Sequence, residues 1–422
     1  MQRPRGTRDL MGKELASIRH VMRVMSELFR RYGYAEVETP TFEHLELFTK
    51  KSGENVVRQL YAFKDKSGRD LALRPELTAP VVRLYIQQLR SFPKPVKLCY
   101  FGSCFRYEEP QAQRWRQFMQ AGVEVIGSAR PEADAEVVAV ADSVMRELGL
   151  DGRELKIGNI RLLRKVLANA GVEGDAQDRV LRAIDSHEDG RIQEELGRIG
   201  MDAKSRQLVT KLIKLRGGVE VLEKVERLLN GIPETDQALR NFRDVIDCLG
   251  PMGVERFVVD MGIARGLEYY TDFVFEIYVG GVQVAGGGRY DTLIELLGGS
   301  STPAVGVGFG VDRIAQTLIE LDAAPARGGL DCMVLPANEG VLKECLKLVT
   351  ELRRAGLSAD VDLMGRKLGK AISYADSLKV KRVVVVGTRD LSEGRVIIRN
   401  MMTGKQESVS RDELAKRLKS VS

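Results

Sequence analysis

Histidine is scarce in this sequence: the 422 residues contain only three, His20, His44 and His187. None lies in a recognisable catalytic or metal-binding motif, which argues against Ser-His-Asp hydrolysis, histidine-held zinc and histidine general-base chemistry. The five cysteines include one close pair, Cys99 and Cys104, and no second pair at zinc-like spacing, so we expect a reduced, cytosolic protein. No apolar run approaches the ~20 residues of a transmembrane helix. The basic N-terminus also lacks the apolar region of a secretory signal.

Charge of either sign is abundant, but it is unevenly distributed along the chain. Lysine and arginine number 65 and aspartate and glutamate 59, which makes the net charge +6. Residues 331–422 hold 18 of the basic and 12 of the acidic residues, so the whole excess lies there and residues 1–330 are neutral. A modest positive charge permits a polyanionic partner without requiring one.

The length and the periodicity of apolar residues predict several domains. At about 100–200 residues each, two to four domains are expected. Residues 1–150 and 251–322 contain strand-like stretches between amphipathic helices, whereas aliphatic residues recur three and four places apart across 151–250. After a linker at 323–329, short strands and helices alternate through 331–422. We therefore predict an α+β domain with antiparallel strands, divided by a helical insertion, and a C-terminal α/β domain.

Two strand-like stretches, residues 96–108 and 117–126, are separated by a polar loop. Alternation places Arg106 and Glu108 on one face of the first stretch. The second stretch, with the residue before it, groups Arg116, Gln120, Gly122 and Glu124 on one face. Paired strands would combine these faces into one floor for a ligand with a phosphate and a cationic group, because buried polar side chains need partners. A solvated sheet face with cross-strand ion pairs is the alternative.

Turn-like and glycine-rich segments supply further candidates. Residues 73–78 place a carboxylate and a hydroxyl where a helix begins, with a simple helix cap as the alternative. Residues 264–270 put an arginine before a glycine and two tyrosines, with a turn and a surface arginine as the alternative. The glycines of 285–291 and 306–313 would let the backbone approach a flat ligand. None of these segments has the dinucleotide-binding or Walker A pattern, which argues against a Rossmann dehydrogenase and a P-loop enzyme.

Taken together, these segments resemble the histidyl-tRNA synthetases, a family of class II aminoacyl-tRNA synthetases. The three class II motifs are matched by Tyr32–Pro40, by Phe105–Glu108 with Arg116–Phe118, and by Gly308–Arg313. The histidine-specific signatures are matched by Arg265–Tyr270 and Ala285–Asp291, and the family's Arg-Pro-Glu-x-Thr segment by Arg74–Ala79. Leu77 stands where many bacterial members carry glycine, and this stretch is archaeal-like.

The resemblance implies both a fold and a reaction. The fold is an antiparallel sheet flanked by helices, a helical insertion after motif 2, and a C-terminal α/β anticodon-binding domain. The reaction joins L-histidine and ATP, with Mg²⁺, into histidyl-adenylate, and then transfers histidine to the histidine tRNA. The family also implies a cytoplasmic homodimer with motif 1 at the interface, and no membrane partner or protein-bound metal.

Roles for individual residues also follow from the resemblance. Catalytic roles fall to Arg265, Arg106 and Arg313, with Arg265 stabilising the charge that develops on the α-phosphate. ATP is expected to contact Arg106, Glu108, Arg114 and Arg313, because arginine suits phosphate oxygens. Histidine is expected to contact Glu76, Thr78, Gln120, Glu124, Arg265, Tyr269, Tyr270 and Tyr290.

The motif 2 loop is expected to meet the tRNA. Gln111 matches a loop residue that faces the tRNA acceptor end. Glu109 stands where bacterial relatives often have arginine, so the bacterial way of reading the extra 5′ nucleotide is not carried over.

Two other functions remain as alternatives. One is a catalytically silent paralogue that acts as a regulatory subunit in histidine biosynthesis. Such paralogues typically lack the anticodon domain and depart from the Arg265–Tyr270 pattern, both of which are intact here. The other is a synthetase for another amino acid, such as proline or threonine.

Overall fold

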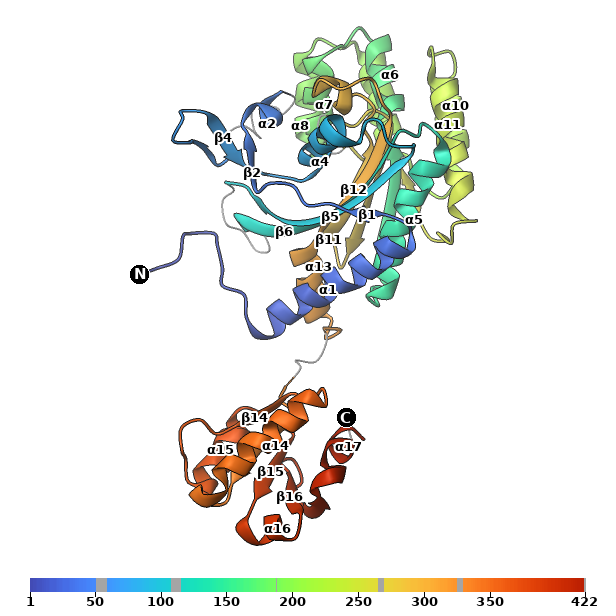
Figure 1. Cartoon of the computed structure of the whole chain (residues 1–422). Helices are drawn as coiled ribbons and strands as arrows, with labels where there is room; N and C mark the ends of the chain where they lie inside the picture. The colour runs from blue at the N-terminus through green and yellow to red at the C-terminus, as the bar shows by residue number, and fades with distance from the viewer. Residues whose placement is uncertain (51–58, 108–114, 187, 265–268, 325–328, 421–422) are drawn as a thin grey trace. The chain divides into compact units, whose positions relative to one another are not determined.

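The chain forms two compact units, Met1–Pro325 and Ala326–Ser422, which are described separately (Figure 1). This computed structural model describes residues 1–50, 59–107, 115–186, 188–264, 269–324 and 329–420. None of the described helices is both long enough and apolar enough to span a bilayer. The finer segment boundaries predicted near residues 150, 250 and 322 stay predictions.

A large sheet forms the centre of the first unit, with nine strands among the described residues (Figure 1). Across the sheet they are β1 (Ala35–Glu36), β5 (Val96–Phe105), β6 (Gln117–Ile126), β12 (Ala304–Gly310), β11 (Val282–Arg289), β10 (Phe273–Val279), β7 (Glu154–Asn159), β9 (Val258–Asp260) and β8 (Arg216–Gly217). Neighbours run antiparallel except in the pairs β1–β5 and β7–β9. The predicted α+β class is confirmed, and the two predicted polar strands are the paired strands β5 and β6.

One face of this sheet is covered by helices. The helices α1 (Gly12–Arg31), α5 (Pro131–Glu147) and α13 (Val311–Glu320) pack against one another and against the sheet. Apolar residues at helical spacing bury one side of α1, and its Phe29 ring lies 5.8 Å from Phe101 of β5 and 5.9 Å from Phe309 of β12. Because strand side chains alternate between faces, the residues next to Phe101 and Phe309 point to the opposite face.

The range predicted as a helical insertion is mostly helical. Its helices are α6 (Ile160–Asn169), α7 (Asp175–Asp185), α8 (Asp189–Arg198), α9 (Ala203–Ile213), α10 (Val221–Leu229) and α11 (Thr235–Leu249). However, the same range also contributes β7, which pairs with β10 and β9 inside the main sheet. This strand is only six residues long and runs directly into α6, so the helical periodicity around it hides its alternation.

A three-stranded sheet positions the next helix. Its strands are β2 (Phe42–His44), β4 (Asp70–Leu73) and β3 (Ala62–Lys64), in the order β2-β4-β3, and a short turn joins β4 to α4 (Thr78–Leu84). The buried Arg74 holds this turn, because its guanidinium donates to the carbonyls of Thr39 at 2.6 Å and Ser103 at 2.9 Å. The turn therefore lies against β5.

The second unit is the predicted α/β domain. Its described sheet has the order β14-β13-β15-β16-β17, formed by β14 (Ala359–Val361), β13 (Cys332–Pro336), β15 (Arg382–Val386), β16 (Arg395–Asn400) and β17 (Gln406–Ser410). Strands β14, β13 and β15 are parallel, and α14 (Leu342–Arg354) and α15 (Leu368–Ser377) pack on the sheet. Successive residues of β13 belong to two separate apolar clusters, so this central strand is buried on both faces.

A buried ion pair joins the main sheet to α5. Arg289, at the end of β11, donates to the two carboxylate oxygens of Asp134 at 2.9–3.0 Å, and each side chain is 5% exposed. Its guanidinium also donates to the Ser128 carbonyl and to Asp291. The pair therefore fixes the segment that leads from β11 to Tyr290.

We expect Asp134→Ala to destabilise the first unit by about 3–5 kcal/mol, because the buried guanidinium loses its main partner. Trp115 is the single tryptophan of the chain, so its fluorescence during urea unfolding reports on the first unit alone. The control is Glu132→Ala, which breaks an exposed pair with Arg130 and should cost no more than about 1 kcal/mol. Equal effects of the two substitutions would contradict the prediction.

Candidate active site

Three strands supply a floor for the candidate site. In the register of β5, β6 and β12, Glu124 lies between Leu98 and Gly306, and Gly122 lies between Tyr100 and Gly308. These residues share the face opposite to the helices α1, α5 and α13. The predicted shared face of Gln120, Gly122 and Glu124 is thus confirmed, whereas Glu108 lies outside the described residues; β12 extends this floor with glycines.

The glycines of this floor leave room for functional side chains. A Cβ on Gly306 would overlap the Glu124 carboxylate, and one on Gly122 would overlap the Tyr100 hydroxyl. A Cβ on Gly308 would lie 2.7 Å from the amide nitrogen of Gln120. Glycine is therefore needed here for close approach rather than for an unusual backbone conformation.

Glu124 is buried at the bottom of the site. It is 1% exposed and accepts hydrogen bonds from the hydroxyls of Tyr100, at 2.9 Å, and Tyr290. Burial raises the pKa of Glu124 to about 8, although the two tyrosine hydroxyls oppose the shift. This pKa favours the protonated carboxyl at neutral pH, and an N–H group of a ligand would favour the ionised form.

Glu76 forms a second buried carboxylate near this floor. Its two oxygens accept the backbone N–H groups of Thr78 at 2.6 Å and Ala79 at 3.0 Å, so it caps the first turn of α4. This is the helix cap named as the alternative from sequence. The Thr78 hydroxyl lies 3.5 Å from that of Tyr100, which also binds Glu124, so the cap lies beside the floor. Burial raises the pKa of Glu76.

Two arginines that the family pattern assigns to ATP are held by backbone carbonyls. Arg106 donates to the Pro75 carbonyl at 2.9 Å, and its guanidinium lies 5.2 Å from the centroid of the Phe118 ring. Arg313 stands in the first turn of α13 and donates to the Gln283 carbonyl at 2.9 Å. Both side chains are partly exposed, and the planar fork of N–H donors on a guanidinium suits the oxygens of a phosphate.

Aromatic rings form one wall of the site. The Tyr269 ring lies 5.0 Å from that of Tyr270 and 5.7 Å from that of Tyr290. Burial raises the pKa of Tyr269 and of Tyr290 well above the usual range, so both hydroxyls remain neutral donors. An apolar wall ending in hydroxyl groups suits a flat ring that carries N–H groups.

Comparisons with known proteins agree with this geometry. Residues 6–314 match the family model described as histidyl-tRNA synthetase, and residues 331–421 match one described as an anticodon binding domain. The chain is 41% identical to the histidine–tRNA ligase of Methanocaldococcus jannaschii, covering 98% of each chain. It is 42% identical to that of Methanosarcina acetivorans, covering 99% of this chain and 98% of the relative.

The chain belongs to the histidyl-tRNA synthetase family.

Its fold agrees with that assignment. The crystal structure of histidyl-tRNA synthetase from Nostoc sp. PCC 7120 superposes with a TM-score of 0.84 at 23% identity, over 99% of both chains. The main sheet with its helices, and the separate α/β unit, are therefore those of a histidyl-tRNA synthetase.

Several residues that the family pattern selects are not described by the structure. Arg265, Glu108, Arg114, Gln111 and Glu109 lie outside the described residues. Among the described ones, Glu76, Thr78, Gln120, Glu124 and the three tyrosines border the same floor. Within this part of the chain, no group of three or more His, Cys, Asp or Glu side chains could hold a metal ion.

Sequence reasoning missed Tyr100 and Cys104. Tyr100 holds Glu124, and the Cys104 thiol donates to the Gln120 side-chain oxygen at 3.1 Å. Tyr100 and Cys104 lie four residues apart on β5, so alternation puts both on the face that forms the floor. Strand alternation puts both residues on the same face as Arg106, so the sequence did contain a sign of their position. They were passed over because a tyrosine and a cysteine in an apolar strand look like ordinary core residues.

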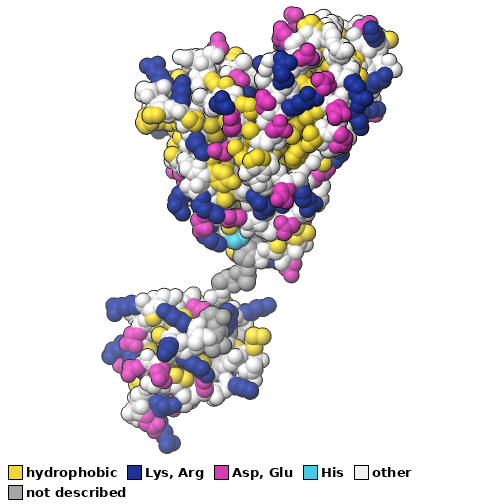
Figure 2. Space-filling view, turned by 90° about the vertical axis from the view of Figure 1, so that its right-hand side faces the viewer, with side chains coloured by type: hydrophobic (Ala, Val, Ile, Leu, Met, Phe, Trp, Pro, Cys, Tyr) yellow, Lys and Arg dark blue, Asp and Glu magenta, His cyan; other side chains and the backbone are white. Residues whose placement is uncertain are grey.

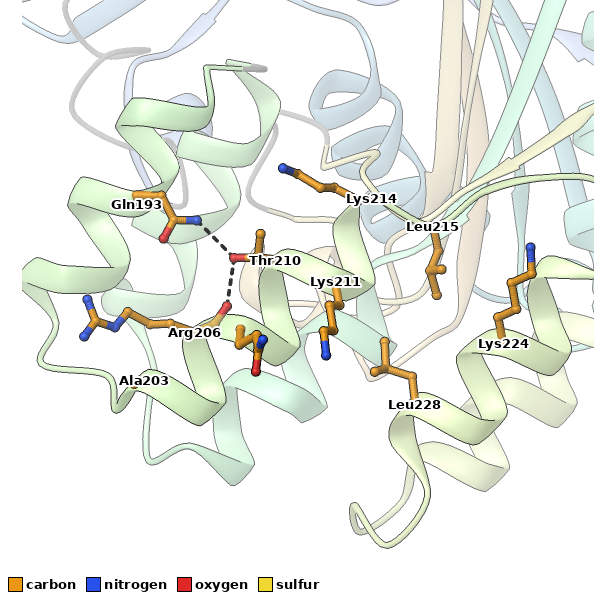
Figure 3. Close-up of a pocket in the computed structure, with 10 residues that line it drawn as sticks. Gln193, Ala203, Arg206, Thr210, Lys211, Lys214, Leu215, Lys224 and Leu228 are labelled. Atoms are coloured by element: carbon orange, nitrogen blue, oxygen red, sulfur yellow. Dashed lines mark hydrogen bonds between the residues drawn. The ribbon is translucent and has the colours of Figure 1, made fainter.

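A separate groove lies in the predicted insertion. It has a volume of about 730 Å³ and is lined mainly by α9 and α10, with the cations Arg206, Lys211, Lys214 and Lys224 around an apolar wall (Figure 3). None of the residues assigned to histidine or ATP lines this groove. In this histidyl-tRNA synthetase fold it is therefore distinct from the candidate active site.

Proposed function

We propose that this chain attaches histidine to its tRNA in two steps, through a histidyl-adenylate formed from histidine and ATP. The observation that supports this most directly is the buried Glu124 between Tyr100 and Tyr290, above a floor of glycines. A protonated carboxyl that ionises on binding, with hydroxyl donors around it, suits a ligand that carries N–H groups and a flat ring.

The substrate histidine occupies the buried end of the site in this proposal. Its amino and imidazole nitrogens contact Glu76, Thr78, Gln120 and Glu124, and its ring packs against the tyrosines named above. Arg265 contacts the carboxyl or phosphate at the reacting centre. Because the polar partners are supplied in fixed positions, an amino acid without a ring N–H would give Glu124 no donor to favour its ionised form and would bind more weakly.

ATP occupies the more open end. Arg106 and Arg313, with Glu108 and Arg114, contact its phosphates and base, and Mg²⁺ enters with the phosphates as part of the substrate. Arg106, Arg313 and Arg265 stabilise charge that develops on the phosphate as the histidine carboxylate attacks. No proton transfer to a protein histidine is required.

Histidine-dependent exchange of pyrophosphate into ATP tests the proposal. We expect exchange with histidine and none above background with proline or threonine. Exchange with proline instead of histidine would contradict the amino acid assignment, and no exchange with any amino acid would favour the silent regulatory alternative. The matched anticodon binding domain at residues 331–421 argues against that alternative.

The raised pKa of Glu124 predicts that histidine binding releases a proton. Folding raises this pKa from 4.5 to about 8, so the empty site is mostly protonated at pH 7.5. A bound N–H donor favours the ionised form, and about 0.5–0.8 proton should leave per site. The release should vanish as the pH rises well above 8.

Calorimetric titration of histidine in buffers of different ionisation enthalpy measures this release. Glu124→Gln is the control, since it removes the titrating group while it keeps an acceptor. No proton release by the unmodified protein at pH 7.5 would contradict the role of Glu124.

We further propose that the second unit binds the anticodon region of the tRNA and that Gln111 faces its acceptor end. The excess of positive charge in residues 331–422 supports this assignment. Because phosphate contacts release counterions, the KM for tRNA should rise at least about tenfold between roughly 50 and 200 mM salt. Pyrophosphate exchange without tRNA should change much less, and an equal response of the two assays would contradict the assignment.

We also propose a cytoplasmic homodimer with the motif 1 segment, Tyr32–Pro40, at the interface. The short strand β1 in this segment is an edge strand of the main sheet, which supports its availability to a second copy. Sedimentation velocity tests the proposal, and a species of monomer mass at assay concentrations would contradict it.

A further inference from the structure

The N-terminal segment before α1 binds the chain just before β6. The Gly6 carbonyl accepts the backbone N–H of Arg116 at 2.8 Å, and the Arg116 carbonyl accepts that of Arg106 at 3.0 Å. Gly6 has a φ of +80°, and a Cβ there would lie 2.7 Å from the Arg116 side chain. The segment is therefore seated on the residues that lead into β6, beside the ATP-facing Arg106.

The side chain of Arg8 in this segment is largely enclosed by α1, α13 and Trp115. Its side chain is 11% exposed, donates to the carboxylates of Glu14 and Asp312, and lies 4.7 Å from the centroid of the Trp115 ring. Glu14 is in the first turn of α1, and Asp312 is in the first turn of α13. A planar guanidinium can satisfy two carboxylates and a ring face at once, whereas an ammonium group cannot do so in the same geometry.

Asp312 also binds strand β6, which forms part of the floor of the site. One of its oxygens accepts from Arg8, and the other accepts the backbone N–H of Met119 in β6. Met119 precedes Gln120, and Asp312 precedes Arg313. A single carboxylate thus fixes the start of α13 against β6, between a residue assigned to histidine and one assigned to ATP.

We propose that Arg8 is a positioning residue for ATP, which holds Arg313 and the Trp115–Met119 stretch in register through Asp312. The proposal rests on the proposed function. In this proposal Arg8 does not contact a substrate: it neutralises the Asp312 carboxylate, whose side chain is 9% exposed, and so holds the segment that carries the ATP-assigned Arg313. If Arg313 and the Trp115–Met119 stretch are displaced, kcat/KM should fall more for ATP than for histidine. The reason is that Glu124 and its tyrosine partners are held by separate contacts.

The key variant is the neutral pair Arg8→Met with Asp312→Asn. It avoids an unpaired buried charge, and the asparagine still offers an oxygen to the Met119 N–H group. In pyrophosphate exchange we expect kcat/KM for ATP to fall by about 10- to 100-fold. The KM for histidine should stay within about twofold, and Arg8→Lys with native Asp312 should recover part of the loss.

The control is Lys13→Met. Lys13 pairs with Asp322 at 3.4 Å and so also joins the N-terminal region to the end of α13, but its side chain is 47% exposed and that of Asp322 is 97% exposed. We expect this variant to match the unmodified protein in both substrates. Circular dichroism at the assay temperature checks that every variant is folded.

An equal fall in kcat/KM for ATP and for histidine would overturn the proposal, because it would indicate a purely structural role. An unchanged kcat/KM for both substrates would also overturn it. Failure of the proposed function looks different, because the unmodified protein would then show no histidine-dependent exchange. In that case calorimetric binding of Mg²⁺-ATP and of histidine replaces the kinetic readout, and Arg8 must still affect ATP alone.

Discussion

Replacing Gly306 with alanine is expected to lower kcat/KM for histidine activation by about 100-fold, because a displacement of about 1 Å at a reacting centre costs that much. The added methyl group would overlap the Glu124 carboxylate, and the Val123 carbonyl would lie only 2.7 Å from it. Glu124 is buried on every side, so it can yield only by leaving Tyr100 or Tyr290.

Steady-state pyrophosphate exchange measures the effect, with the KM for histidine rising more than the KM for ATP. The control is Gly152→Ala, at a position where a Cβ would meet no atom within 4 Å. That variant should retain full activity. An unchanged kcat/KM for histidine in Gly306→Ala would show that the Glu124 side chain can adopt another position, and it would contradict the close packing of the floor.

Removing the guanidinium of Arg265 should lower the rate of adenylate formation by about 10²- to 10³-fold, the scale for losing one donor that acts in the transition state. The prediction comes from the Arg265-Gly-Leu-Glu-Tyr-Tyr270 pattern, since Arg265 itself lies outside the described residues. The adjoining Tyr269 and Tyr270 border the floor beside Glu124, which supports a reacting centre nearby.

Single-turnover formation of histidyl-adenylate by Arg265→Ala separates chemistry from binding. The KM values for ATP and histidine should change little, because the lost interaction strengthens mainly in the transition state. Arg256→Ala is the control, since Arg256 is an exposed arginine of the same region. A rate near that of the unmodified protein would refute the catalytic role.

Local patterns in the sequence were enough to predict strands β5, β6 and β12 and to suggest that their polar residues share one face. The boundaries of β6 and β12 follow from alternation ended by glycine or polar residues, and antiparallel pairing then brings Gln120 and Glu124 beside the glycines. The helix α1 follows from its apolar spacing. These features depend on neighbours within about ten residues, for which periodicity is informative.

The contacts that were not predicted join residues far apart in the sequence. Arg8 and Asp312 are 304 positions apart, and Asp134 and Arg289 are 155 apart. Neither partner is unusual in its own segment, because a charged residue near a helix start or a strand end usually faces solvent. Tyr100 was missed for a related reason: the register between β5 and β6 is needed to show that its hydroxyl meets Glu124.

The glycine floor also limits how the specificity of this site can be redesigned. Gly122, Gly306 and Gly308 have no side chain that could be shortened to make room for a larger amino acid substrate. The large side chains that contact Glu124 are Tyr100 and Tyr290, and shortening either one removes a hydroxyl partner of Glu124. Shortening a tyrosine would therefore enlarge the site but leave the Glu124 carboxyl without one hydrogen-bond donor. Libraries that vary a tyrosine and Glu124 jointly should thus yield more active variants for a larger substrate than libraries that vary one position at a time.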